Sequence, residues 1–242
     1  MIGYYDIHTH ILPGIDDGAR DMEETREMIF LAYNEGIRHI IATPHFESGK
    51  ENVPAGELCR LLEEVKKEAR RTVPNMAFSL GNELLDSAGI LEDLEEGRAL
   101  TLAGTRYILV EFYPRDSYSK IYASLRSYLT GGYIPIVAHM ERYDALRKKF
   151  RNIRELTQLG AFFQMNTSSL ADGVPRRDAM YHRKLLEEGY IHFLGSDCHR
   201  KDSRAPLMKS MFGYLWEDFA DSEIGKAILE RNPADMLADK YI

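Results

Sequence analysis

Short apolar runs alternate with longer stretches of helical periodicity along most of the chain. The apolar runs are rich in β-branched and aromatic residues, which is typical of buried strands. We predict strands at Tyr4–His8, Ile37–Thr43, Met76–Leu80, Tyr107–Phe112, Tyr133–His139, Ala161–Met165 and Ile191–Gly195. Each run is too continuously apolar for a strand with one solvated face, so the pattern indicates a sheet that is covered on both sides.

Helix start and stop signals fall between most of these strands. Asp21 and Glu24 predict a capped helix start, Gly36 predicts the end of that helix, and Pro54 predicts the start of the next one. Further helices are predicted over Ser119–Leu129, Asn152–Leu159, Arg177–Glu188 and Leu207–Phe219. Residues 82–105 show the least periodicity.

An alternation of strands and helices predicts an α/β fold with parallel strands and right-handed crossovers. Seven such strands can close into a (β/α) barrel or remain an open, doubly wound sheet. The first strand is not followed by a GxGxxG turn, which disfavours dinucleotide binding. The chain has 242 residues without an internal repeat or a linker, so we expect residues 1–242 to form a single domain.

Composition narrows the possible partners and compartment. Lysine and arginine number 31 against 38 acidic residues, and this net charge of −7 disfavours nucleic acid as a partner. No apolar run approaches the 18 residues of a membrane span, so we expect no membrane insertion. The first residues, MIGYYDIHTH, do not resemble an export signal, and two cysteines suit a reducing compartment. The expected location is cytoplasmic.

Histidine and acidic residues gather where the predicted strands end. Because the carboxyl ends of parallel strands meet at one edge, these side chains are expected to converge there. An HxH pair on a strand also places both imidazoles on one face. Imidazole and carboxylate together suit Mn, Fe or Zn, and the set is large enough for two or three ions. The candidate ligands are His8, His10, Asp17, His45, Glu83, Glu111, His139, Asp197 and His199.

Taken singly, most of these residues are weak indicators. Glu111 is stronger, because a carboxylate in an apolar strand needs a partner or a metal ion. The joint pattern is the main argument, since six of the seven predicted strands carry a ligand type at the same end. Asp16 competes with Asp17 for the acidic position in the loop after the first strand. The remaining histidines are interpreted as ordinary packing or surface residues: His39, His182 and His192.

The segments DIHTHILPGIDDGA, ATPH, GNE, VEF, AHMERY and GSDCH resemble the polymerase and histidinol phosphatase (PHP) superfamily. Within it, the chain is most similar to the bacterial manganese-dependent protein-tyrosine phosphatases of capsular and exopolysaccharide operons. The resemblance extends from Asp6 to about Pro206. It implies a distorted (β/α)7 TIM-like barrel with a three-metal centre at the C-terminal face of the strands.

Position by position, the resemblance implies the same nine ligands that the strand ends indicate. It also implies that Arg142 and Arg204 bind the phosphate. Two positions depart from the usual pattern: Met140 stands where proline is familiar, and Cys198 occupies a variable position between two predicted ligands. Neither departure removes a ligand.

The activity implied by the resemblance is hydrolysis of phosphotyrosine in a protein, with manganese as the expected metal and a bacterial tyrosine kinase as the expected partner. We expect a hydroxide held by the ions to attack phosphorus while the two arginines hold the phosphoryl oxygens. Tyrosine leaves as a phenolate whose conjugate acid has a pKa of about 10, so no general acid is required.

Four alternatives compete with this function. One is a nuclease or polymerase-associated phosphodiesterase, which the acidic net charge disfavours. A PHP phosphatase acting on a small substrate such as histidinol phosphate would need almost the same ligands, and a degenerate centre would leave a non-catalytic, metal-bound regulator. Cys198 and Arg204 also have the C-x5-R spacing of cysteine-dependent phosphatases. A phosphate-cradling loop needs glycine and bare backbone, whereas this one reads His-Arg-Lys-Asp-Ser, so we expect no cysteine catalysis.

Overall fold

The computed structural model describes residues 3–171 and 173–242. Its strands are β1 (Tyr4–Thr9), β2 (Ile37–Ala42), β3 (His45–Glu47), β4 (Ala77–Leu80), β5 (Glu83–Leu85), β6 (Tyr107–Glu111), β7 (Ile134–Val137), β8 (Phe162–Asn166) and β9 (Phe193–Gly195). Its helices are α1 (Met22–Asn34), α2 (Ala55–Ala69), α3 (Ile90–Glu95), α4 (Tyr118–Thr130), α5 (Phe150–Leu159), α6 (Arg176–Glu187), α7 (Lys209–Phe212), α8 (Trp216–Asp221), α9 (Glu223–Lys226) and α10 (Asn232–Leu237).

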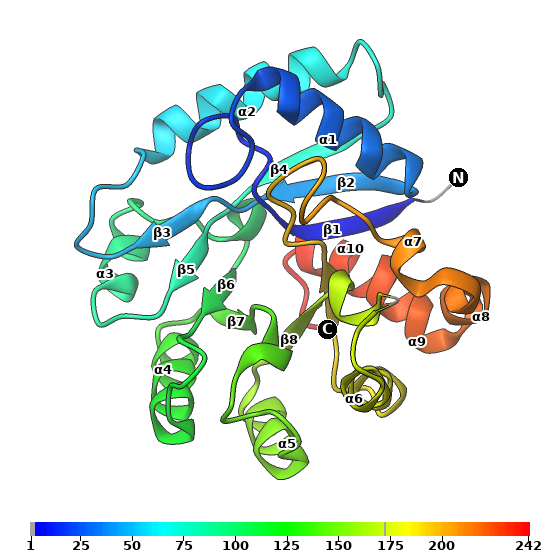
Figure 1. Ribbon diagram of the computed structural model, residues 1–242. Coiled ribbons are helices and arrows are strands. Elements are labelled where there is room, and N and C mark those ends of the chain that lie inside the picture. The colour runs from blue at the N-terminus through cyan, green and yellow to red at the C-terminus, as the bar shows by residue number, and fades with distance from the viewer. Residues whose placement is uncertain (1–2, 172) are drawn as a thin grey trace.

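Neighbouring strands pair in parallel throughout the two sheets. One sheet has the order β1-β2-β4 and the other has the order β3-β5-β6-β7-β8-β9. Every strand pairing recorded within the described residues is parallel. Most helices lie around the outside of the strands (Figure 1). The predicted parallel α/β architecture is therefore confirmed, while closure into a seven-stranded barrel stays a prediction.

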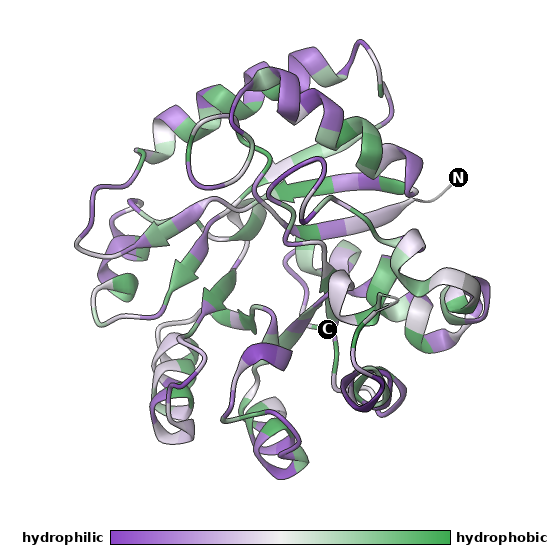
Figure 2. Ribbon diagram, in the orientation of Figure 1, coloured by the Kyte–Doolittle hydropathy of each residue, from purple (hydrophilic) through white to green (hydrophobic). Residues whose placement is uncertain are grey.

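Alternate residues along the strands enter two different apolar clusters. The smaller cluster lies between the strands and includes Ile41, Leu109 and Ile136. The larger cluster joins the neighbouring strand positions Ile40 and Val110 to the helices. This division follows from the period of two in a strand, and it explains the continuously apolar runs. In Figure 2 the apolar colour covers much of β5 and β6, while most of α6 is hydrophilic.

All seven predicted strands are present, with ends that differ by one or two residues from the predictions. Two short strands, β3 and β5, were missed because each follows another strand after only two residues and has no turn signal of its own. One helix prediction was wrong in its continuity. The segment Leu207–Phe219 is divided between α7 and α8 because Gly213 adopts a positive φ of 54°.

None of the helices in residues 3–171 and 173–242 has both the length and the apolar character that crossing a bilayer requires.

The capped start of α1 provides a test of the local sequence signals. The Asp21 carboxylate accepts a hydrogen bond from the Glu24 amide at 2.9 Å. We expect Asp21→Ala to lower the free energy of unfolding by about 1 kcal/mol, or roughly 2–4 °C in Tm, measured by thermal denaturation. Glu23→Ala is the matched control, because it removes the same charge from the first turn without removing a cap. Equal effects of the two substitutions would contradict the capping role.

Candidate metal centre

The structure brings all nine predicted ligands together at the carboxyl ends of the strands. His8 is in β1, and His10 and Asp17 are in the loop that follows it. The other members are His45 at the start of β3, Glu83 at the start of β5, Glu111 at the end of β6, His139 after β7, and Asp197 and His199 after β9. Because the strands are parallel, residues that are far apart in the sequence come together at their carboxyl ends in one cluster.

Three overlapping groups within this cluster have the spacing of metal sites. In each group, one ligand atom from every residue lies within 4.8 Å of the others. The groups are His8, His10, Glu83 and Asp197; His10, Asp17, His45 and His199; and His45, Glu83 and Glu111. His139 joins them through Nε2, which lies 2.9 Å from Glu83 Oε1 and 3.4 Å from Glu111 Oε1.

Glu83 shows how well this donor set fits a cation. Its Oε2 lies 3.1 Å from His8 Nε2, 3.1 Å from His45 Nδ1 and 3.3 Å from His10 Nε2. Yet this buried atom has no hydrogen-bond partner among the described residues. A buried carboxylate oxygen without a partner is costly, and converging imidazole nitrogens are the usual partners of a shared metal ion. The residues present therefore fit divalent cations.

The outer ring nitrogens of the histidines are held by other groups. His10 Nδ1 lies 2.7 Å from Asp16 Oδ2, and His8 Nδ1 lies 3.2 Å from Gln164 Oε1. His199 Nδ1 lies 3.0 Å from a backbone oxygen. A hydrogen bond at one ring nitrogen orients the ring and leaves the other nitrogen free to bind a metal ion. All three rings thus turn Nε2 toward the cluster.

The sequence left open which of two adjacent aspartates is the ligand, and the structure places them differently. Asp17 Oδ1 lies 3.1 Å from His199 Nε2 and 3.4 Å from His45 Nε2, within the cluster. Asp16 instead accepts hydrogen bonds from the backbone amides of Gly18 and His45 and lies against the outer nitrogen of His10. This geometry favours Asp17 as the ligand and Asp16 as a residue that orients His10.

Electrostatic coupling is strong at the centre of the cluster. Burial alone would lower the pKa of His10, but the close contact with Asp16 and the negative charges of Asp16 and Glu83 raise it to about 10. Burial would raise the pKa of Glu83, yet the surrounding imidazoles hold it well below its usual value. The surrounding imidazoles therefore keep the Glu83 carboxylate ionised, which is the state that binds a cation.

One set of supporting residues was missed by the sequence reasoning. Gln164 and Asn166 of β8 lie on one face of the strand and are buried. Gln164 Oε1 accepts a hydrogen bond from the His139 amide at 2.7 Å, and its Nε2 donates to Asn166 Oδ1 at 2.8 Å. Asn166 Nδ2 donates to Asp197 Oδ2 at 2.7 Å. The sequence did contain a signal for them, because two side-chain amides stand at alternate positions of an otherwise apolar strand.

The two predicted phosphate-binding arginines flank Asp197. Arg142 Nη2 lies 2.9 Å from Asp197 Oδ2, and Arg204 Nη2 lies 2.6 Å from Asp197 Oδ1. Their side chains are 42% and 44% exposed, so each guanidinium retains donors that face solvent. Positive φ angles of 51° at Asp197 and 55° at Arg204 show a backbone held in the strained conformation that is common at functional sites.

The three histidines that were expected to be packing or surface residues make their hydrogen bonds outside the cluster. His39 Nε2 lies 2.9 Å from Ser79 Oγ, His182 Nδ1 lies 2.7 Å from the Ser169 oxygen, and His192 Nδ1 accepts from a backbone amide. None of them belongs to the three groups found within the described residues.

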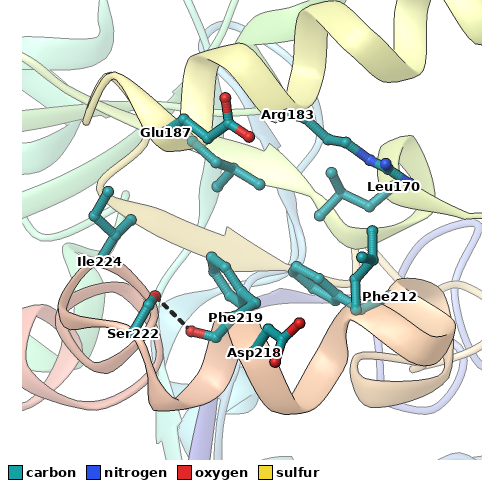
Figure 3. Close-up of a pocket in the computed structure, with 10 residues that line it drawn as sticks. Leu170, Arg183, Glu187, Phe212, Asp218, Phe219, Ser222 and Ile224 are labelled. Atoms are coloured by element: carbon teal, nitrogen blue, oxygen red, sulfur yellow. Dashed lines mark hydrogen bonds between the residues drawn. The ribbon is translucent and has the colours of Figure 1, made fainter.

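Hollows in the surface place the cluster at an accessible edge. A hollow of about 220 Å³ has Asp16 and His45 in its wall. A larger apolar pocket, with a cavity volume of about 290 Å³, lies between α6 and the C-terminal helices (Figure 3). Leu170, Phe212 and Phe219 line it, and its described lining contains none of the nine ligands. The apolar pocket is thus separate from the metal cluster.

A family model for capsular polysaccharide synthesis, CpsB/CapC, matches residues 4–238. The chain belongs to the CpsB/CapC family. This membership confirms the family predicted from the sequence motifs.

Relatives in the family carry names that state an activity. The tyrosine-protein phosphatase CpsB of Streptococcus agalactiae serotype V is 31% identical over 242 residues, which cover 98% of this chain and 99% of that protein. The tyrosine-protein phosphatase YwqE of Bacillus subtilis is 36% identical over 202 residues, which cover 82% and 78% of the two chains. Both names describe phosphoric monoester hydrolases, the enzyme class predicted from the sequence.

A solved structure agrees with these relatives. A chain from the crystal structures of YwqE from Bacillus subtilis and CpsB from Streptococcus pneumoniae, described there as unique metal-dependent tyrosine phosphatases, superposes with a TM-score of 0.88. It is 30% identical, and the match covers 98% of this chain and 96% of that one. The phosphotriesterase homology protein from Escherichia coli, with 15% identity and a TM-score of 0.58, shares the fold alone.

Cys198 occupies a structural position in this family member. Its side chain is fully buried, and its backbone oxygen accepts a hydrogen bond from the His10 amide at 3.0 Å. Burial raises the pKa of the thiol well above its usual value. A thiol that stays protonated and inaccessible is a poor nucleophile.

We therefore expect Cys198→Ser to retain most phosphatase activity and to resist iodoacetamide, whereas His199→Ala should lose nearly all of it because an imidazole ligand is removed. Hydrolysis of an aryl phosphate measures both effects. His39→Ala is the control for loss of an imidazole outside the cluster. A trapped phosphocysteine adduct at position 198 would overturn this assignment.

Proposed function

We propose that this chain is a metal-dependent protein-tyrosine phosphatase. The observation that carries the proposal is the convergence of nine candidate ligands in one cluster that contains the unpartnered Glu83 Oε2, with two arginines beside it. The names of the relatives supply the substrate class, since those proteins are tyrosine-protein phosphatases.

The proposed ligands are His8, His10, Asp17, His45, Glu83, Glu111, His139, Asp197 and His199. We propose two to three divalent ions, with manganese as the native metal. When bound, such ions lower the pKa of a water molecule toward neutrality, which supplies a nucleophile, and they offset charge on the phosphoryl oxygens. Glu83 is the one carboxylate that belongs to two of the three groups, so it would help to hold more than one ion.

Arg142 and Arg204 are proposed to hold the phosphoryl group. Each guanidinium has five N–H donors, so it can keep its bond to Asp197 and still bind phosphoryl oxygens on its exposed side. The planar fork suits these oxygens better than an ammonium group does. Asp197 then sets the separation and direction of the two arginines, which positions the phosphorus for attack.

The choice of tyrosine follows from the leaving group. A phenolate has a conjugate acid with a pKa of about 10 and departs with little protonation, whereas a serine alkoxide requires an acid. We propose that the substrate protein is a bacterial tyrosine kinase that controls capsule or exopolysaccharide synthesis. The family's link to capsular polysaccharide synthesis supports this partner.

We also propose that the strands close into a distorted (β/α)7 barrel within a single domain. If β2 with β3, and β4 with β5, are each treated as one interrupted strand, the pairings run in sequence from β1 to β9. An isolated parallel bridge between Thr9 and Cys198 then connects β9 back to β1. This ring would bring the ligands on both sheets to one face.

The proposed function is tested with a substrate panel under defined metals. Chelation should abolish hydrolysis of a phosphotyrosine peptide, and manganese should restore it more fully than magnesium, because imidazole ligands favour the softer ion. Phosphotyrosine should be turned over much faster than phosphoserine or histidinol phosphate. Full activity without metal would refute the mechanism, and a preference for histidinol phosphate would indicate a small-substrate phosphatase. No turnover at all, with metal bound, would indicate a regulator.

The phosphate-binding role is tested by substitution. Arg142→Ala and Arg204→Ala should each reduce kcat/KM by roughly 30- to 1000-fold, corresponding to about 2–4 kcal/mol for one charge-assisted contact. Metal content should stay near that of the unmodified protein. Arg154→Ala serves as the control, since this exposed arginine hydrogen-bonds Tyr190 and lies outside the cluster. Normal turnover by both site variants would show that the clamp is assigned wrongly.

A further inference from the structure

Tyr143 is a fully buried residue directly after the short turn Met140–Arg142. Its ring packs edge-to-face against Phe112, with centroids 5.9 Å apart and an interplanar angle of 89°. Its hydroxyl has two partners. The Phe112 amide donates to it at 3.1 Å, and His139 Nδ1 lies 3.2 Å away.

These two contacts link two strands that carry predicted ligands. Phe112 directly follows Glu111 at the end of β6, and His139 follows β7. The opposite ring nitrogen of His139, Nε2, faces the Glu83 and Glu111 carboxylates. One phenol oxygen thus lies behind the His139 ring and also holds the backbone next to Glu111.

The contact at Nδ1 allows two forms of the His139 ring, and metal binding at Nε2 requires one of them. A phenol oxygen has two lone pairs, and the Phe112 amide occupies one of them. If His139 Nδ1 carries the proton, it donates to the second lone pair and Nε2 is free to bind a cation. If the phenol donates instead, the neutral ring carries its proton on Nε2, which then cannot bind a metal ion.

Backbone geometry shows that the ring is held under constraint. His139 has a φ of 30°, a left-handed conformation that costs free energy in a residue other than glycine. Its amide is fixed by Gln164 Oε1 at 2.7 Å. With the backbone held in this way, the phenol is the remaining contact at Nδ1 within the described residues, and it decides the direction of the ring.

We propose that Tyr143 is a positioning residue that holds His139 with its Nδ1 protonated and its Nε2 directed at the ion shared with Glu83 and Glu111. This role rests on the metal centre of the proposed function. Tyr143 contacts neither the substrate nor the ion in this assignment, so its effect passes entirely through His139 and the end of β6.

The decisive variant is Tyr143→Phe, which keeps the ring and its packing and removes the hydroxyl. Its matched control is Tyr128→Phe, because Tyr128 is also buried and its hydroxyl donates to Asp86 at 2.8 Å, outside the nine ligands. Both changes remove a buried hydrogen bond, so a purely structural role predicts similar effects of the two. The probe is Mn²⁺ alone, with binding measured by competition with a chelator and folding checked by thermal denaturation.

We expect Tyr143→Phe to weaken Mn²⁺ binding at the affected site by about 10- to 100-fold, as loss of an outer-sphere partner typically does, while Tyr128→Phe changes it by less than about twofold. Equal Mn²⁺ affinities for the two variants would overturn the positioning role. Because binding is measured without substrate, a chain that shows this difference yet hydrolyses no phosphate ester would refute the phosphatase activity and leave the inference on Tyr143 standing.

A second measurement uses the unmodified protein and does not depend on the folding of a variant. The ring nitrogens of His139, labelled with ¹⁵N, are observed by NMR with diamagnetic Zn²⁺ bound. A protonated Nδ1 and a metal-bound Nε2 are the expected result. An unprotonated Nδ1 would exclude donation to Tyr143 and overturn the proposal even if the Mn²⁺ affinities had differed.

Discussion

The burial of the Glu83 carboxylate among imidazole rings is the constraint on which the rest of the site depends. The side chain is 1% exposed, and one of its oxygens accepts no hydrogen bond from the described residues. An isolated charge in such a place would destabilise the fold severely, so the surroundings must supply positive charge. Imidazoles from β1, β3 and the end of β7 do this, and a divalent cation fits the same position.

No single segment supplies the groups that surround Glu83; the strand topology brings them together. Parallel pairing places every strand's carboxyl end on the same edge, so residues that are distant in sequence meet without long connections. The apolar clusters on both faces of the strands hold this edge rigidly. Rigidity matters because a metal site tolerates only small displacements of its ligands.

Hydrogen bonds from residues behind the histidines fix the direction in which each imidazole ring points. Asp16, Gln164 and Tyr143 each lie against the outer nitrogen of a different histidine in the cluster. Asn166 extends the Gln164 contact to Asp197, whose carboxylate in turn pairs with both arginines. The proposed metal ligands and the proposed phosphate clamp are therefore parts of one hydrogen-bonded network. Strained backbone at Asp197 is maintained within that network.

The sequence by itself determined seven of the nine described strands, the α/β class and the nine ligand candidates, because apolar runs and residue types at strand ends are local signals. Only the tertiary structure placed Asp17 within the cluster and Asp16 behind His10, interrupted the helix predicted at Leu207–Phe219, and showed the contacts of Gln164 and Tyr143. Those outcomes depend on distances between segments far apart in the chain. In the sequence, a glutamine or tyrosine that only packs in the core looks the same as one that orients a metal ligand. The residues around it in the folded protein distinguish these two roles.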